Sequence, residues 1–111
     1  MDTRQFIDTC CANNYDDVKE MMQTDIATLD NCKKALDFVI LSALKADDMV
    51  DKLRIIGILV NEHPSILTMK NNCNDTPIEL AKRLVKDFYN VRYETILDKL
   101  NSLYMVHNNI A

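Results

Sequence analysis

Gly57 is the only glycine in this chain of 111 residues, and Pro64 and Pro77 are its only prolines. Folds built from β-strands use these two residue types at most hairpins, so a chain with so few is poorly supplied with the turns that a sheet needs. Apolar side chains also recur every three or four positions over several long stretches, which is the periodicity of helices that bury one face. We therefore expect an all-α protein.

The totals of the chain fit one folded domain over residues 1–111. Hydrophobic residues make up 48% and charged residues 27%, which is typical of a globular domain rather than of a disordered one. The net charge of −4 disfavours nucleic acid and phospholipid surfaces, because both need clustered lysine and arginine. No apolar run reaches the roughly 18 residues of a membrane span, and the acidic start does not resemble a signal peptide.

The four cysteines, Cys10, Cys11, Cys32 and Cys73, form no C-x-x-C pair. This pattern favours a reduced, intracellular and cytoplasmic protein.

The clearest local signal is the start of a helix at Pro77. Thr76 is a suitable N-cap and proline is favoured at the first helical position, while the polar residues 71–75 suit a tight turn. The apolar side chains of this helix lie on one face: Ile78, Leu80, Ala81 and Leu84.

Further helices are predicted on both sides of this one. Asp2 or Thr3 caps a first helix, Asn13 and Asn14 interrupt it, and a second helix covers 15–23. Residues 24–33 form a polar connector, 34–46 a helix, and 49–61 another helix after a break at Asp47 and Asp48. After the connector 65–70 and the helix that begins at Pro77, residues 86–93 are ambiguous and 94–106 form the last helix.

Two details concern packing. The apolar run from Phe38 to Leu41 predicts a helix buried on all sides, and Val50 is placed on an apolar face of 49–61 with Leu53, Ile56 and Val60. Gly57 within that helix costs about 1 kcal/mol relative to alanine, which indicates a close backbone approach at this point.

The segment Thr76-Pro77-Ile78-Glu79-Leu80-Ala81 resembles the T-P-L-H-x-A core of an ankyrin repeat. Residues 6–22 resemble an amino-terminal ankyrin unit, with Asn13-Asn14 where the family has a glycine. In the middle unit Lys34-Ala35-Leu36-Asp37 replaces T-P-L-H. The units cover about 3–30, 31–70 and 71–106.

The spacing between units is longer than in the family. Val18, Ile55 and Ile96 stand at equivalent places 37 and 41 residues apart, whereas ankyrin units repeat about every 33. We assign the excess to long turns at 46–52 and 86–93.

The resemblance implies a solenoid of stacked antiparallel helix pairs that binds a protein partner on its concave face and has no enzymatic activity. Carried over by position, the turn tips are Asp30, Asn31 and Lys33 in the middle unit and Asn72, Cys73 and Asp75 in the last. The partner-facing positions on the inner helices are Cys11 and Ala12, then Leu41 and Ser42, then Arg83 and Leu84, and the two leucines are the expected apolar anchors.

Catalytic, cofactor and metal sites are not indicated. His63 and His107 are the only histidines, and no H-E-x-x-H, G-x-S-x-G or glycine-rich phosphate loop is present. The cysteines and His63 lack the paired spacing of a zinc site. Cys10 is interpreted as a small core residue rather than a reactive thiol.

An alternative keeps the helices without the stack. A compact five- or six-helix bundle would serve as a self-associating, homodimeric regulator or structural protein. Eleven asparagines and a single glycine are also typical of A/T-rich genomes, which adds the hypothesis of a viral or parasite factor that acts on host proteins in the host cytoplasm.

Overall fold

The computed structural model describes residues 2–45 and 49–108. Within these two ranges the chain is helical and contains no strand, which confirms the all-α prediction. No helix in them is both long and apolar enough to cross a bilayer. The α-helices are α1 (Thr3–Cys11), α2 (Tyr15–Met21), α3 (Leu29–Leu41), α4 (Met49–Glu62), α5 (Pro77–Phe88) and α6 (Val91–His107), with 3₁₀ helices η1 (Ala43–Lys45) and η2 (Pro64–Thr68).

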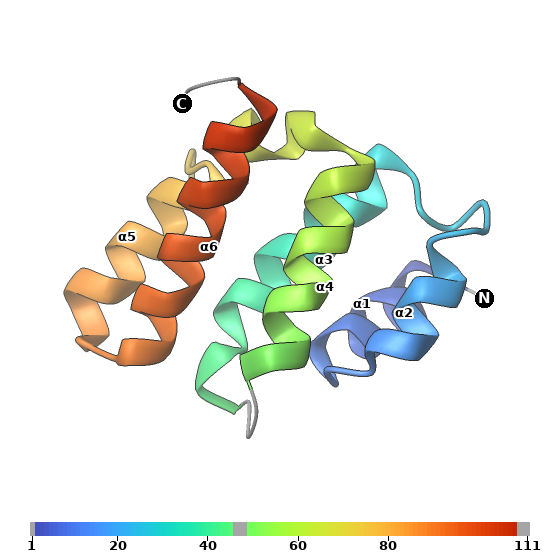
Figure 1. The fold of residues 1–111 in the computed structure, drawn as a ribbon, viewed down its shortest axis with the longest axis horizontal. Helices are drawn as coiled ribbons and strands as arrows, with labels where there is room; N and C mark the ends of the chain where they lie inside the picture. The colour runs from blue at the N-terminus through green and yellow to red at the C-terminus, as the bar shows by residue number, and fades with distance from the viewer. Residues whose placement is uncertain (1, 46–48, 109–111) are drawn as a thin grey trace.

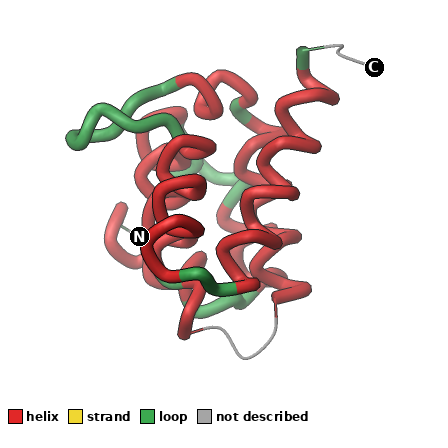
Figure 2. The backbone as a smooth tube through the Cα atoms, turned by 90° about the vertical axis from the view of Figure 1, so that its left-hand side faces the viewer, coloured by secondary structure: helices red, strands yellow, loops and turns green. Residues whose placement is uncertain are grey.

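The helices lie as three neighbouring pairs, α1 with α2, α3 with α4 and α5 with α6 (Figure 1). α3 packs against both α1 and α5, and α4 packs against both α2 and α6. The pair α3–α4 therefore occupies the middle of the molecule, and the other two pairs form its opposite edges. Figure 2 shows the loops that join the ends of successive helices.

Side-chain caps explain where most helices begin. At five helix starts a side-chain oxygen of the N-cap residue accepts a hydrogen bond from a backbone N–H of the first turn, as at Asp2, Asn14, Thr28, Thr76 and Asn90. Such a cap satisfies one of the amides that the helix itself leaves unpaired. Asp2 and Thr76 had been predicted in this role, and both form complete capping boxes.

The turn between α1 and α2 also follows the prediction. Asn13 has φ 62°, which is the left-handed conformation that asparagine tolerates better than most residues. An asparagine therefore provides the left-handed residue at this turn, a role that glycine often fills.

The start of α3 differs from the prediction. Residues 24–33 were expected to be a connector, but Thr28 accepts a hydrogen bond from the Asn31 N–H and α3 begins at Leu29. Asp30, Asn31 and Lys33 consequently lie in the first turns of a helix and are not the tip of a turn. The expected break at Asp47 and Asp48 falls outside the described residues.

The prediction of a long turn at 86–93 is also wrong. α5 continues to Phe88 and α6 begins at Val91, so only Tyr89 and Asn90 connect them. Tyr89 ends α5 in the left-handed conformation, and Asn90 caps α6 through the N–H of Arg92. The residues that were assigned to a long turn instead lie mostly in these two helices.

The core is formed by apolar side chains of all six helices together with Ile66 and Leu67 of η2. Two predictions about it are wrong. Val39 and Ile40 are fully buried, but Phe38 is 51% exposed and Leu41 49% exposed, because α3 turns these two positions away from α1 and α4. Val50 is 61% exposed, and Lys52 occupies the buried face of α4.

Candidate functional site

A groove of about 460 Å³ lies between one side of α3 and the segment 69–73. Its lining residues come from α3 and from the chain that follows η2: Asp30, Lys33, Lys34, Asp37, Phe38, Leu41, Met69, Lys70, Asn71, Asn72 and Cys73. We call this the α3 groove. It brings together Asp30, Lys33, Leu41, Asn72 and Cys73 from the set that the sequence had proposed for partner binding.

The apolar part of the groove consists of Phe38, Leu41 and Met69. Phe38 and Leu41 are three residues apart, so they lie next to each other on the surface of α3. Each exposes about half of its surface, while Met69 is partly buried against the core. Large apolar side chains that are grouped and exposed in this way are typical of sites that contact another protein.

Charged side chains surround the apolar part. The Lys33 ammonium lies 2.8 Å from a carboxylate oxygen of Asp37, and both side chains are largely buried. Burial raises the pKa of the Asp37 carboxyl, and the hydrogen bond from Lys33 opposes this shift. Lys34 and Asp30 form a second, exposed pair at 3.3 Å.

Lys70 is the remaining charged residue of the lining. It is exposed and forms no ion pair with any residue in 2–45 or 49–108. Three lysines and two aspartates give the groove a charge of +1, whereas the whole chain carries −4. The groove is thus a locally basic site on an acidic protein.

The wall formed by residues 69–73 is held by its own hydrogen bonds. The side-chain oxygen of Asn71 accepts from the backbone N–H groups of Cys73 at 2.9 Å and of Asp75 at 3.1 Å. Asn74 adopts the left-handed conformation at φ 65°. Asn72 and Cys73 are exposed at the tip of this turn, as the sequence predicted.

Asp75, Arg83 and Leu84, which were expected at the partner-facing surface, lie elsewhere. Asp75 forms an ion pair with Arg83 of α5, so the two residues fasten the turn to the helix. Leu84 is only 8% exposed and belongs to the core. The prediction that Leu84 anchors a partner is therefore wrong.

Asn31 and Ser42 have structural partners instead of lining the groove. The Asn31 side chain accepts from the Thr3 hydroxyl at 3.1 Å and donates to the Ile26 carbonyl at 2.8 Å. The Ser42 hydroxyl oxygen lies 3.0 Å from the Lys52 ammonium. Both residues therefore connect elements of the fold.

Phe38, Met69 and Lys70 also line the groove and were not among the partner-binding residues predicted from the sequence. A signal for Phe38 was available, because Lys34 and Leu41 precede and follow it by one helical turn each and Asp37 is adjacent. A face of α3 that carries such charges is expected to meet solvent. Met69 and Lys70 had no comparable signal, since they join the groove only through the path of the chain after η2.

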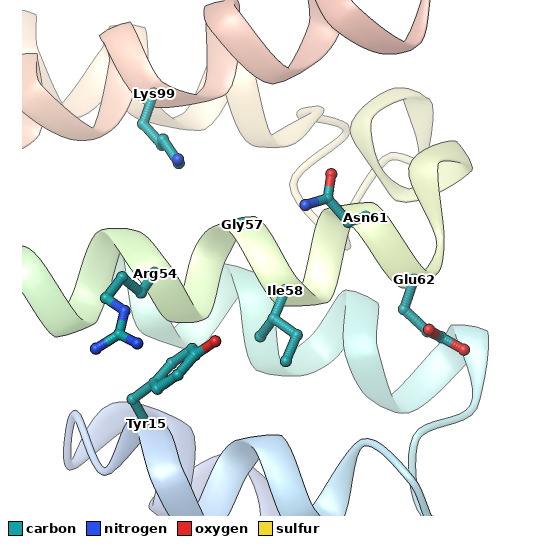
Figure 3. Close-up of a pocket in the computed structure, with 7 residues that line it drawn as sticks. All are labelled: Tyr15, Arg54, Gly57, Ile58, Asn61, Glu62 and Lys99. Carbon is teal, nitrogen blue, oxygen red and sulfur yellow. The ribbon is translucent and has the colours of Figure 1, made fainter.

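A second concavity of about 370 Å³ lies along α4 (Figure 3). The Arg54 guanidinium stacks on the Tyr15 ring, 3.7 Å from its centre. Lys99 approaches α4 from α6, on the side opposite Tyr15 in this view. The two cations do not converge on a common point, so the geometry does not form an anion site.

The glycine in this second concavity has more room than predicted. A Cβ at Gly57 would meet the Cε and Nζ atoms of Lys99 at 3.6 Å. That is an ordinary contact with the end of a flexible side chain. The close backbone approach expected from the sequence is not found.

The cysteines give no active site. Burial raises the pKa of Cys10 to about 12 and that of Cys32 to about 11, and both side chains are fully enclosed in the core. Cys10 therefore has the place of a core residue. In the part of the chain that the structure describes, no three histidine, cysteine or acidic side chains are grouped as metal ligands would be.

No protein-family model matches the chain, and comparisons with curated proteins and with solved structures find no significant match.

Proposed function

We propose that this chain is a non-enzymatic protein-interaction module that binds a segment of a partner protein in the α3 groove. The observation that carries this proposal is the exposed pair Phe38 and Leu41 between a charged helix face and an ordered turn. Because about half of each side chain is exposed to water, Phe38 and Leu41 contribute little to the free energy of folding. They would contribute to binding when a partner covers them.

We also propose that the three helix pairs form a short ankyrin-like stack. In such a stack each inner helix packs on the next inner helix and each outer helix on the next outer one. The contacts of α3 with α1 and α5, and of α4 with α2 and α6, support this arrangement. The α3 groove then lies on an inner helix beside a turn tip, which is where the family resemblance places partner contacts.

The charge of the groove suggests the chemistry of the partner. Lys33 and Lys34 are paired with Asp37 and Asp30, which leaves Lys70 as a cation that a ligand can approach. We propose a segment that inserts an apolar side chain between Phe38 and Leu41 and carries a carboxylate within reach of Lys70. Burying the apolar groups supplies affinity, and the ion pair fixes the orientation.

The test is a quantitative capture experiment from a native extract. The variant Phe38→Ser/Leu41→Ser removes the apolar part of the groove, and because both residues are exposed the fold should be retained. Val50→Ser/Val106→Ser is a matched control, since it removes two exposed apolar side chains that do not line the groove. Circular dichroism and thermal unfolding establish that all three proteins fold alike.

We expect to capture proteins that bind the wild type and the control equally. The same proteins should bind the groove variant at least about tenfold more weakly. For a partner identified in this way, Lys70→Glu should weaken binding of the purified proteins and reduce its dependence on salt. If the groove variant retains every protein that the wild type captures, the α3 groove is not the binding site and the proposal fails.

A further inference from the structure

The lining of the α3 groove includes an ion pair that is largely shielded from water. The Lys33 ammonium donates to both carboxylate oxygens of Asp37, at 2.8 and 2.9 Å. The Lys33 side chain is 6% exposed and the Asp37 side chain 16% exposed. Every other ion pair within residues 2–45 and 49–108 is more exposed than this one.

Lys33 depends on Asp37 for its counter-charge. No other carboxylate in the described part of the chain forms an ion pair with the Lys33 ammonium. A cation with so little contact to water is costly to keep inside a protein unless an opposite charge accompanies it. If Asp37 lost its charge, the buried position of Lys33 would therefore become unfavourable.

The charge of Asp37 is easier to remove than that of an exposed aspartate. Burial raises the pKa of the Asp37 carboxyl above its ordinary value of 3.8, and Lys33 opposes this shift without cancelling it. Asp37 therefore takes up a proton at a less acid pH than an exposed aspartate does. The protonated carboxyl can still accept a hydrogen bond, but it no longer balances the charge of Lys33.

Other charged groups around α3 do not replace either member of this pair. Within the groove Asp30 pairs with Lys34, and Lys70 lies on the wall formed by residues 69–73. Of the elements packed against α3, η2 carries no charged side chain. Apart from Lys52, which bonds Ser42, the charged groups of α1, α4 and α5 are exposed or paired with one another. Among the described residues, Lys33 is the only charged group that shifts the pKa of Asp37.

The groove gives the Lys33 ammonium a route to water. Lys33 and Asp37 both line the groove, so its space of about 460 Å³ borders the ion pair directly. A lysine has a flexible stem of four carbons, which lets its charged end reach water while the stem lies along apolar surface. Once released from Asp37, the Lys33 side chain would therefore extend into the groove and take up space that a bound segment needs.

We propose that the Lys33–Asp37 pair is a pH-sensitive switch of the α3 groove. At neutral pH the ion pair holds Lys33 back and leaves the groove open to an apolar side chain. In acid Asp37 is protonated, and Lys33 extends into the groove and partly fills it. This regulation rests on the proposed function, because it concerns the same groove, and it makes binding there weaker in acid than at neutral pH.

The test is an NMR titration of the free protein from neutral into acid pH. The carbon signal of the Asp37 carboxyl reports its protonation, and line broadening by an uncharged soluble nitroxide reports how open the groove is at the methyl groups of Leu41 and Met69. We expect Asp37 to titrate with a midpoint above 3.8. The broadening of both methyl signals should fall with that same midpoint, while the relaxation of the Lys33 side chain shows that it becomes more mobile.

Three variants separate the switch from other effects of acid. Lys33→Met removes the moving charge, so Asp37 should titrate at a still higher midpoint while the nitroxide broadening of the groove stays constant. Asp37→Asn cannot titrate, so its groove should be partly filled already at neutral pH and show no transition. Asp30→Asn removes the exposed carboxylate of the neighbouring pair and should behave like the wild type. Circular dichroism at each pH verifies that every protein is folded.

Three results would overturn the switch: an Asp37 midpoint at or below 3.8, groove methyl groups that do not follow Asp37, or a transition that persists in Lys33→Met. These measurements use the free protein, so they are separate from the capture experiment. If the groove captures a partner but shows no such transition, only the switch is wrong. If the transition occurs but the groove variant retains every captured protein, the proposed function is wrong although Lys33 moves.

Discussion

The ammonium nitrogen of Lys52 lies 3.0 Å from the hydroxyl oxygen of Ser42 and 3.2 Å from the carbonyl oxygen of Val39. Lys52 has no exposed surface and forms no ion pair with a carboxylate of residues 2–45 or 49–108. Burial lowers the pKa of Lys52 from its ordinary value of 10.5. Ser42, which the sequence assigned to a partner surface, instead solvates a cation inside the protein.

Replacing Lys52 by methionine should stabilise the protein at neutral pH by about 1–3 kcal/mol, because the cost of burying the charge disappears. The Ser42 hydroxyl already donates to the Val39 carbonyl at 3.1 Å, so the substitution leaves these two groups paired. Urea unfolding of Lys52→Met and wild type measures the difference. Ser42→Ala, which removes an acceptor from the ammonium, should be destabilising.

The advantage of Lys52→Met should also depend on pH. The lowered pKa means that the unfolded chain keeps the Lys52 proton to higher pH than the folded protein does. Between the lowered folded pKa and 10.5 the wild type therefore gains stability as pH rises. The gap between wild type and variant should narrow over that range, and a gap that is constant with pH would contradict the role assigned to the buried charge.

The sequence predicted best those features that depend on a few adjacent residues. Asp2 and Thr76 cap helices because their short side chains reach amides two or three residues ahead, and Asn13 turns the chain because asparagine tolerates φ > 0. The start of α3 also depends on a signal from a few adjacent residues. The Thr28 cap was present in the sequence and was overlooked because the following residues are polar.

Features that depend on which neighbours cover a helix were predicted less well. Leu41 and the tip residues Asn72 and Cys73 were placed correctly at a surface. Leu84 was predicted to be exposed and is buried, whereas Phe38 was predicted to be buried and is half exposed. The apolar pattern alone does not say which side of an apolar helix remains uncovered. Lys52 could not be predicted as buried, since its two acceptors come from residues 10 and 13 positions earlier in the chain.

Gly57→Ala should stabilise the protein by about 0.5–1 kcal/mol, since glycine in a helix interior loses more backbone freedom on folding than alanine does. The added methyl group would make only ordinary contacts with the Lys99 side chain. Urea unfolding at neutral pH measures the gain. A loss of stability would mean that α4 and α6 pack more closely at this point than the distances indicate.

Tyr89→Gly should also be stabilising, by about 1 kcal/mol. Tyr89 has φ 49°, a conformation that costs a residue with a Cβ about 1–2 kcal/mol and glycine almost nothing. The Tyr89 side chain is 86% exposed, so little packing is lost. Tyr89→Ala serves as the control, because it removes the ring and keeps the strained conformation, and it should not reproduce the gain.

The cysteines should differ strongly in their reaction with iodoacetamide. The thiolate is the reactive form, and burial raises the pKa of Cys10 to about 12 and of Cys32 to about 11. Cys73 is exposed at the edge of the α3 groove. Peptide mapping by mass spectrometry should find Cys73 alkylated in the native protein well before Cys10 and Cys32. Equal alkylation rates for Cys10 and Cys73 would contradict this prediction and indicate a reactive thiol in α1.

The capping box of α5 should make stability depend on pH in the acid range. The Glu79 carboxylate accepts a hydrogen bond from the Thr76 N–H at 3.0 Å, and the Thr76 hydroxyl oxygen accepts from the Glu79 N–H at 3.2 Å. The hydrogen bond from the Thr76 backbone is the main cause that lowers the pKa of Glu79 from its ordinary value of 4.5. Because the folded state favours the ionised form, its contribution to stability is present above 4.5 and is lost as pH falls through the folded pKa.

Glu79→Gln isolates that contribution. Glutamine still accepts the hydrogen bond from Thr76, but it does not titrate and carries no negative charge near the positive end of the helix dipole. We expect the wild type to be more stable than Glu79→Gln at neutral pH, and the difference to shrink toward zero as pH falls below 4.5. Urea unfolding at a series of pH values measures both curves. If the two curves stayed parallel into the acid range, the ionised form of Glu79 would not be what stabilises the start of α5.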